Sequence, residues 1–309
     1  MADGRVRELT FTAGEADQGR SVKEILKNHF GLVVHDISRA KYRKDGIRVN
    51  DERTYVTTLL SAGDVLTVRI EDVPAKEVVP GGGTIDILYE DEDLLAVNKP
   101  AGVVVHPSHG HYADSLGNAV AAHYQKSGEN HDIRTIGRLD KDTSGIMLYG
   151  KTRSAVYLLG RQSREGVFRK TYLALTAGHL DNKTGTFDGP IGRVPGEKLK
   201  REVRIDGDAA VTHYEVIAEF DGPAGTQTVS LVRVSLETGR THQIRVHFSH
   251  AGHPLLGDGL YGGPAVGRAL LHCYETTFRK PFSDEMIALR APLPADMAEV
   301  LPAGLRMGI

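Results

Sequence analysis

Runs in which apolar and polar residues alternate dominate the chain after residue 83, and a period of two is typical of β-strands. The clearest runs are IDILYE, LLAVNKP, GIMLYG, RKTYLALTAG, AVTHYEVIAEF and TVSLVRVSLETG. The few helical runs between them do not form the regular strand-helix repeat of a doubly wound sheet. We therefore expect residues 84–309 to form an α+β domain built on a mainly antiparallel, mixed sheet.

Residues 20 to 70 show a different pattern, in which two short helical segments precede two strands. Ser21 and Glu24 form a capping-box pattern ahead of the apolar residues of a first helix. A second helix is expected from Ser38, with a natural stop at Gly46. GIRVNDE and AGDVLTVRI then predict strands beside turns. The pattern predicts a compact α+β unit with its core at residues 17–72.

A stretch rich in proline and glycine separates the two patterns. It contains the sequence VPAKEVVPGGG, has little periodicity, and predicts a linker at residues 76–83. The chain is also longer than a usual single domain. We expect a small domain over residues 1–75 and a larger one over residues 84–309.

Composition limits the class of protein. Hydrophobic residues make up 40% and charged residues 25% of the chain, which is an ordinary globular balance, and no apolar run is long enough for a membrane helix. The first residues lack the basic start and apolar centre of a secretory signal. Cys273 is the single cysteine, which excludes an intramolecular disulfide and fits a reducing compartment. We expect a cytoplasmic monomer without membrane contact.

The run GRLDKDTSG, residues 137–145, is the strongest candidate for chemistry. Its polar residues predict a loop, and the apolar residues from Ile146 to Tyr149 predict a strand that enters the core. Loops fixed at the end of a strand commonly carry functional side chains. Taken alone, however, this run is better explained as a turn in which Asp and Ser side chains cap backbone amides.

Together with three other blocks, the run resembles the pseudouridine synthases of the RluA type, which modify ribosomal and transfer RNA. The blocks are LLAVNKPAGVVVHP, KTYLAL and ETGRTHQIRVHFSHAGHPLLGDGLYGG, in the family's order and spacing from Leu94 to Gly263. One departure is Gly137, where the branch with these downstream blocks usually has histidine, and it bears on the subfamily and the target site. The resemblance implies isomerisation of specific uridines in structured RNA. Ribosomal 23S RNA is the first choice and transfer RNA the alternative.

The reaction explains the residue types that the resemblance assigns. The isomerisation adds no group and changes no redox state, so no cofactor is expected, and an ionised carboxylate can hold the intermediate while the base turns. This role falls to Asp140, and whether it attacks the ribose, attacks the ring or assists a glycal route stays open. Arg240, near the start of an expected helix, would keep the carboxylate ionised. Tyr172 would stack on the uracil and take the proton from carbon 5. A surface arginine and a half-buried strand tyrosine are the structural alternatives.

Other residues in these blocks are expected to bind the substrate or to frame the cleft. Arg138 would occupy the space that the flipped base leaves, since guanidinium planes stack on bases. The expected substrate-binding residues are Arg138, Thr143, His242 and Gln243, and the expected structural residues are Lys99, Pro100, Gly102, Gly257, Asp258 and Tyr261.

The small domain resembles the S-four domain, an RNA-binding module named after a ribosomal protein. The match covers about fifty residues and rests on a basic helix, the segment Gly46 to Asn50, and Gly63-Asp64. Its basic residues, Arg39, Lys41, Arg43, Lys44 and Arg48, are the expected RNA-binding residues. Although the whole chain has a formal charge of −2, phosphate contacts need only a local basic surface. A solvated helix face is an equally good interpretation of this run taken alone.

A second basic group lies in an expected loop between Gly189 and Gly207 and either contacts RNA or is solvated. It consists of Arg193, Lys198, Lys200, Arg201 and Arg204.

The histidines do not predict a metal site. The candidate clusters are His106, His109 and His111, and His242, His247, His250 and His253. Neither cluster has the His-x-x-x-His helical spacing with an adjacent acid that zinc hydrolases use. A metal-dependent hydrolase and a non-catalytic RNA-binding or ribosome-assembly protein remain as alternatives, and the combination of Asp140, Tyr172 and Arg240 favours the enzyme.

Overall fold

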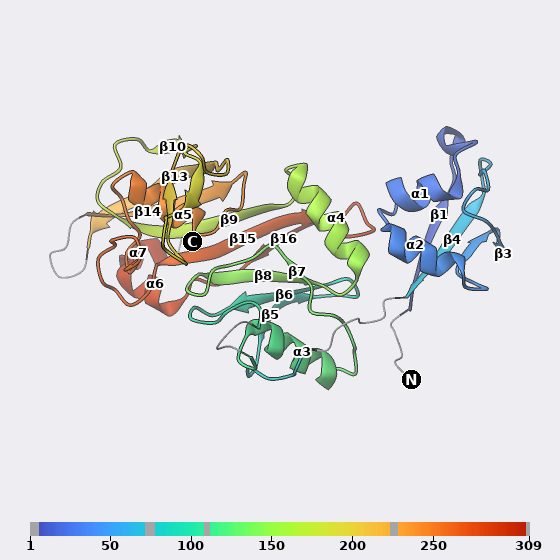
Figure 1. Ribbon diagram of the computed structural model, residues 1–309, viewed down its shortest axis with the longest axis horizontal. Coiled ribbons are helices and arrows are strands. Elements are labelled where there is room, and N and C mark those ends of the chain that lie inside the picture. Colours follow the sequence, from blue (N-terminus) through green and yellow to red (C-terminus); the bar gives the residue numbers. More distant parts are fainter. Residues whose placement is uncertain (1–5, 72–77, 108–111, 223–227, 307–309) are drawn as a thin grey trace.

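The computed structural model describes residues 6–71, 78–107, 112–222 and 228–306 (Figure 1). Residues 6–71 form a four-stranded antiparallel sheet in the order β1-β4-β2-β3, with two α-helices packed against it. Its elements are β1 (Val6–Thr12), η1 (Glu15–Asp17), α1 (Val22–Asn28), α2 (Val34–Lys41), β2 (Ile47–Val49), β3 (Glu52–Arg53) and β4 (Val65–Glu71). Apolar residues of α1, α2 and the sheet share one core.

The predicted first helix is confirmed, and its capping box is formed. The Ser21 hydroxyl accepts from the Glu24 N–H, while a Glu24 carboxylate oxygen accepts from the Ser21 N–H. The start predicted for the second helix was wrong, because α2 begins at Val34 rather than at Ser38. Its N-cap residue, Val33, has no side chain that can cap the helix, so the sequence carries no start signal there.

The predicted core at 17–72 omitted the first strand. β1 forms seven pairs with β4, from Val6–Glu71 to Thr12–Val65. Only Leu9 of this strand is buried, so the alternation that marks a half-buried strand is weak. The predicted linker at 76–83 lies between β4 and the next strand, and part of it lies outside the described residues.

The larger part of the chain is organised around a ten-stranded sheet. Its main path is β10-β13-β14-β9-β15-β8-β6-β5, with β16 paired to β15 and β7 paired to β8. Among the described strands of this sheet, only β8 and β15 pair in parallel, so the predicted mixed and mainly antiparallel sheet is confirmed. The strands of the sheet are β5 (Asp86–Glu90), β6 (Leu94–Lys99), β7 (Thr135–Ile136), β8 (Ser144–Gly150), β9 (Arg169–Ala177), β10 (Thr184–Phe187), β13 (Thr212–Asp221), β14 (Thr228–Leu236), β15 (Leu271–Arg279) and β16 (Met286–Arg290).

The remaining elements cover this sheet or extend from it. The helices are α3 (Leu116–Lys126), α4 (Arg153–Arg164), α5 (Gln243–His250), α6 (Ala295–Val300) and α7 (Ala303–Arg306). A separate two-stranded hairpin, β11 (Ile191–Arg193) with β12 (Arg201–Val203), occupies the segment predicted as a loop between Gly189 and Gly207. That prediction was wrong because each strand has three residues, too few to show a period. In the described ranges, no helix has the length and apolar character needed to cross a membrane.

β8 positions the candidate loop. All seven of its residues are buried, and it lies between β6 and β15 in the sheet. The run GRLDKDTSG leads directly into it, so the loop before β8 stands at the edge of the rigid core.

The two parts of the chain touch through charged and aromatic side chains. Arg7 Nη1 of β1 lies 2.5 Å from Glu92 Oε1 and 2.9 Å from Asp93 Oδ2. The Arg7 guanidinium also lies over the ring of Phe282, which packs against the small core. Figure 1 shows the small domain at one end of the molecule, with α4 beside it.

Candidate active site

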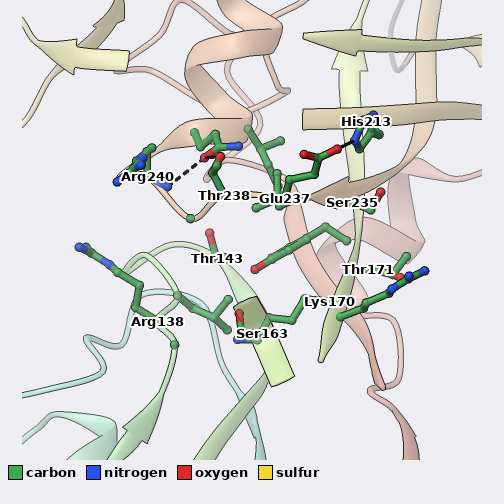
Figure 2. Close-up of a pocket in the computed structure, with 18 of the residues that line it drawn as sticks. Arg138, Thr143, Ser163, Lys170, Thr171, His213, Ser235, Glu237, Thr238 and Arg240 are labelled. Atoms are coloured by element: carbon green, nitrogen blue, oxygen red, sulfur yellow. Dashed lines mark hydrogen bonds and ion pairs between the residues drawn. The ribbon is translucent and has the colours of Figure 1, made fainter. Parts of the chain in front are cut away.

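A cleft of about 1000 Å³ opens between the loop before β8, strand β9 and the turn that leads into α5. Asp140, Tyr172 and Arg240 all line it. Figure 2 shows Arg138 and Arg240 at the same end of this cleft, on facing segments of the chain.

Two basic side chains, the buried Lys99 and the partly buried Arg268, hold the loop that carries Asp140. Lys99 Nζ donates to the carbonyls of Pro100, Val103 and Lys141 at 2.7–2.8 Å. On the other side, Arg268 Nη1 donates to the carbonyl of Asp142 at 2.9 Å. Burial lowers the pKa of Lys99 to about 7, whereas the charges of Asp142 and Asp140 act in the opposite direction. The backbone on both sides of the loop is therefore fixed, as expected of a structural Lys99.

Three side chains that are cationic or can become so surround the Asp140 carboxylate. Arg138 Nη2 lies 3.8 Å from its Oδ1, while Arg245 Nη1 and His242 Nε2 lie 3.9 and 4.0 Å from its Oδ2. The Asp140 side chain is 16% exposed, so it faces the cleft yet is largely shielded. Each carboxylate oxygen of Asp140 therefore has an arginine guanidinium within 4 Å.

The expected ion pair between Arg240 and Asp140 is absent from the described contacts. Arg240 Nε donates to the carbonyl of Ala209 at 2.9 Å, its Nη1 lies 3.9 Å from Asp208 Oδ2, and the side chain is 41% exposed. Arg245, whose side chain is 9% exposed, is the arginine beside the carboxylate. The placement of Arg240 was wrong because it precedes the helix in an open turn, whereas Arg245 points inward from α5.

Arg245 is held rigidly by Asp258. Its Nε and Nη2 donate to the two carboxylate oxygens at 2.6 and 2.7 Å, and its guanidinium lies over the Tyr261 ring. Burial disfavours the charge, but the hydrogen bonds and charge of Asp258 raise the pKa of Arg245. The sequence pattern did not indicate Arg245 as an inward-facing residue. Six of the eight residues of α5 are buried, so the helix has no clear solvent-exposed face that would identify its inner side.

His242 caps α5 in a left-handed conformation, with φ at 59°. Such backbone is costly for a residue other than glycine and is concentrated at functional sites. Its Nδ1 shares a hydrogen bond of 2.9 Å with the Tyr261 hydroxyl. Burial lowers the pKa of His242, so the neutral ring is favoured near neutral pH.

Tyr172 lies on β9 next to the catalytic loop and is buried. Its backbone pairs with Val234 and Cys273, which fixes the side chain at the cleft. Burial raises the pKa of the Tyr172 phenol, and the nearby Cys273 and Asp140 act in the same direction. The phenol is therefore protonated in the resting site, with its ring available for stacking.

The other predicted substrate-binding residues, Thr143, Gln243 and Arg138, differ in whether their side chains can reach a substrate. Thr143 is buried, and its N–H donates to the Asp140 carbonyl at 3.2 Å, which closes the turn of the loop. Gln243 is also buried, and its amide is committed to Val211, Thr212, Thr238 and the Arg240 N–H. Both support the backbone of the site. Arg138, with its side chain 62% exposed, remains free to reach a substrate.

None of the predicted RNA-binding residues of the small domain lines this cleft. Arg39 and Lys41 lie on α2, whereas Arg43 and Lys44 follow its end and Arg48 lies on β2. Lys41 and Lys44 are exposed, but Arg48 donates to Glu8 at 2.9 Å.

Gly257, Asp258 and Tyr261 do not line the cleft themselves, but Asp258 and Tyr261 hold Arg245, which does. Gly257 has φ at 76°, and a Cβ there would lie 1.7 Å from the Arg268 carbonyl, so only glycine fits. As for metals, no cluster of three or more potential ligands is found in the described part of the chain. His109 and His111 lie outside it.

The chain matches a known family and several known proteins. Residues 93–250 match the family described as RNA pseudouridylate synthase. An uncharacterised RNA pseudouridine synthase of Bacillus subtilis, YhcT, is 41% identical over 253 residues, which cover 81% of this chain and 82% of the relative. The ribosomal large subunit pseudouridine synthase D of Vibrio cholerae is 33% identical, over 95% of this chain and 94% of its own.

A solved structure agrees with these relatives. Human RNA pseudouridylate synthase domain containing 1 is 25% identical and superposes with a TM-score of 0.57, over 71% of this chain and 86% of that one. The matched residues contain the loop with Asp140, the strand with Tyr172 and the helix with Arg245. The chain belongs to the RNA pseudouridine synthase family and is an RNA-modifying isomerase.

Proposed function

We propose that the enzyme isomerises uridines of 23S ribosomal RNA, with Asp140 as the nucleophile and Arg245 as its charge partner. The observation that carries the proposal is the position of Asp140 among Arg138, Arg245 and His242, in a cleft that Tyr172 also lines. The RNA is proposed from the names of relatives that act on the large ribosomal subunit, and transfer RNA is the alternative.

The chemistry fits these groups. The bond from the ribose to the ring nitrogen breaks, the base turns, and the ribose rejoins carbon 5, which then loses its proton while the nitrogen gains one. The Asp140 carboxylate, beside the Arg245 guanidinium, can form and release a bond to the substrate during this turn. Tyr172 supplies a ring on which the base stacks, and its protonated hydroxyl can act as a relay that takes the carbon 5 proton as it gives its own proton to the freed nitrogen, which leaves the phenol neutral.

The target uridine has to leave its stack to reach Asp140, which costs a few kcal/mol. Arg138 is placed to offset this cost, because its exposed guanidinium stands beside the nucleophile and can stack in the vacated space. Gly137, with φ at 74°, gives this loop a conformation that a side chain would strain. We propose that this shape contributes to the choice of uridine.

Asp140→Asn tests the nucleophile. The amide is nearly isosteric but cannot attack, so pseudouridine formation should fall at least a thousandfold, while RNA affinity stays within about threefold. Turnover is measured on 23S RNA transcripts, and affinity by filter binding. Asp142→Asn, two residues away on the same loop, is the matched control and should keep most activity. Wild-type turnover by the Asp140 variant would contradict the proposal.

Mapping identifies the RNA. Pseudouridines in total RNA are compared between a strain that lacks the gene and the same strain carrying either the wild-type or the Asp140→Asn copy. Sites in 23S RNA should vanish with the gene and return only with the wild-type copy. Loss confined to transfer RNA would replace the proposed substrate and leave the mechanism intact.

A further inference from the structure

The hairpin β11–β12, with the residue that follows it, contains five basic residues, none of which lines the cleft described above. Lys198 and Lys200 lie in the connection between its strands, are exposed, and pair with no carboxylate in the described part of the chain. Arg204, by contrast, is held by Asp206 and lies near Glu202. The connection therefore presents two exposed lysines that form no ion pair among the described residues, beside one exposed acid, Glu197.

An apolar residue stands between the two lysines. Leu199 is 70% exposed, so its apolar side chain is accessible to a partner. A partner that suits this tip offers anionic groups at the lysines and an apolar face at the leucine. Unpaired RNA has both, as phosphates and as the faces of its bases and sugars.

The base of the hairpin is attached to the helix that carries Arg245. Ile191 and Val203 pack in one small core with Val246 of α5 and with Tyr261. His247 of the same helix donates to the Gly189 carbonyl at 2.8 Å. The hairpin therefore has a fixed position relative to the catalytic groups.

Two hydrogen bonds join the hairpin to His242, whose ring lies near the nucleophile. The Arg201 N–H donates to the Tyr261 hydroxyl at 3.0 Å, and this hydroxyl also bonds His242 Nδ1 at 2.9 Å. The other ring nitrogen of His242 lies 4.0 Å from Asp140 Oδ2. A shift of β12 would therefore change how the imidazole sits beside the carboxylate.

We propose that the β11–β12 hairpin is an RNA-contacting arm, which binds the backbone next to the target uridine through Lys198 and Lys200 and positions His242 through Tyr261. The proposal rests on the proposed function, since it places the bound RNA at the Asp140 cleft. Tyr261 acts here as a positioning residue. The arm supplies affinity, whereas its attachment to Tyr261 affects the chemical step.

Charge reversal tests the arm. In Lys198→Glu/Lys200→Glu, RNA affinity should fall at least tenfold at moderate salt, and the slope of log affinity against log salt should decrease by about 1.4 in magnitude, near 0.7 for each lost phosphate contact. The rate at saturating RNA should stay within about threefold. The single variants Lys198→Glu and Lys200→Glu are measured as well. Lys126→Glu, at an exposed lysine at the end of α3, is the control for each of them, because it changes the charge by the same amount.

Tyr261→Phe tests the attachment. The ring that lies beneath Arg245 is kept, so the fold should be retained, but both hydrogen bonds of the hydroxyl are lost. The rate at saturating RNA should fall at least tenfold while KM changes less than threefold. A purely structural tyrosine would lower the melting temperature without this split between kcat and KM.

The tests of the arm and of its attachment to Tyr261 can fail or succeed independently of the proposed function. Affinities are measured with the Asp140→Asn enzyme, where no reaction occurs, on a 23S RNA transcript and on a transfer RNA transcript. Phosphate contacts should weaken on either RNA when the lysines are reversed. Unchanged affinity and salt slope on both would overturn the arm, and an unchanged rate in Tyr261→Phe would overturn its coupling to His242, whichever RNA is the natural substrate.

Discussion

Arg245 and Arg240 lie five positions apart in one sequence block, but the protein surrounds them differently. Arg245 is buried and fixed by a bidentate pair with Asp258, whereas Arg240 bonds a carbonyl at the rim of the cleft. A rigid cation in a shielded site acts on a neighbouring charge much more strongly than an exposed one does. The two arginines are therefore expected to differ in their effect on catalysis.

Exchange of each arginine for glutamine measures this difference. Arg245→Gln should lower kcat about a hundredfold or more, because Asp140 loses its buried charge partner. Arg240→Gln should lower kcat less than tenfold. Since Arg245→Gln leaves Asp258 buried and unpaired, the double variant Arg245→Gln/Asp258→Asn controls for stability. Equal effects of the two single changes on kcat, at matched melting temperatures, would contradict the assignment.

At the scale of residues, the sequence predicted which segments meet at the cleft, but it did not predict correctly which side chains contact each other there. The loop with Asp140 and the strand with Tyr172 were placed correctly, since each combines a recognisable block with a clear local pattern. The arginine beside Asp140 was predicted wrongly. Arg240 and Arg245 lie in the same sequence block, and the sequence does not show which of them points toward Asp140 until the direction of the helix is known. Gln243 was taken for a substrate ligand, but all its polar atoms are used by backbone and hydroxyl groups.

At the scale of elements, half-buried strands were predicted and irregular ones were not. β15 was missed although it lies between β8 and β9, because its buried residues include His272 and Thr276. Polar residues inside a central strand remove the contrast on which periodicity depends. The hairpin β11–β12 was missed for the opposite reason, since it is short and rich in charge.

The basic end of α2 offers a test of the small domain. Lys41 and Lys44 are exposed, and reversing both to glutamate should weaken RNA binding and reduce the salt slope by about 1.4 to 1.8 in magnitude, depending on whether the bound RNA is single-stranded or helical. Lys23→Glu/Lys27→Glu on α1 changes the charge equally within the same domain and is the control. If both pairs weaken binding to the same extent, α2 has no specific role and only the net charge of the domain matters.

At the scale of the whole molecule, the contact between the two parts of the chain contains a carboxyl group that is sensitive to pH. Asp93 is fully buried, and burial raises its pKa to about 7, although the charge of Arg7 opposes this. In the unfolded chain an aspartate releases its proton near pH 4. Between these values the folded protein holds a proton that the unfolded chain does not.

Stability should consequently decrease as pH rises toward 7. The contribution of Asp93 is fully present below about pH 4, is lost as the pH rises through about 7, and changes by at most about 1.4 kcal/mol per pH unit between them. Denaturant unfolding of the wild type, Asp93→Asn and Asp284→Asn from pH 5 to 8.5 measures it. Asp93→Asn should have the flatter profile, and the exposed Asp284 should leave the profile unchanged. Parallel profiles for all three proteins would show that Asp93 does not titrate in this range.

The parallel pairing of β8 with β15 has a consequence for protein synthesis. Ser144 begins the strand that follows the catalytic loop, and its partner His272 comes 128 residues later in the chain. Arg268, which holds the Asp142 carbonyl, comes equally late. All strand pairs of the small domain, by contrast, lie within residues 6–71. During translation the small domain, which we expect to bind RNA, is complete long before the loop with the proposed nucleophile Asp140 can be fixed in place. We therefore expect an unfinished chain to lack an organised loop with which to modify RNA.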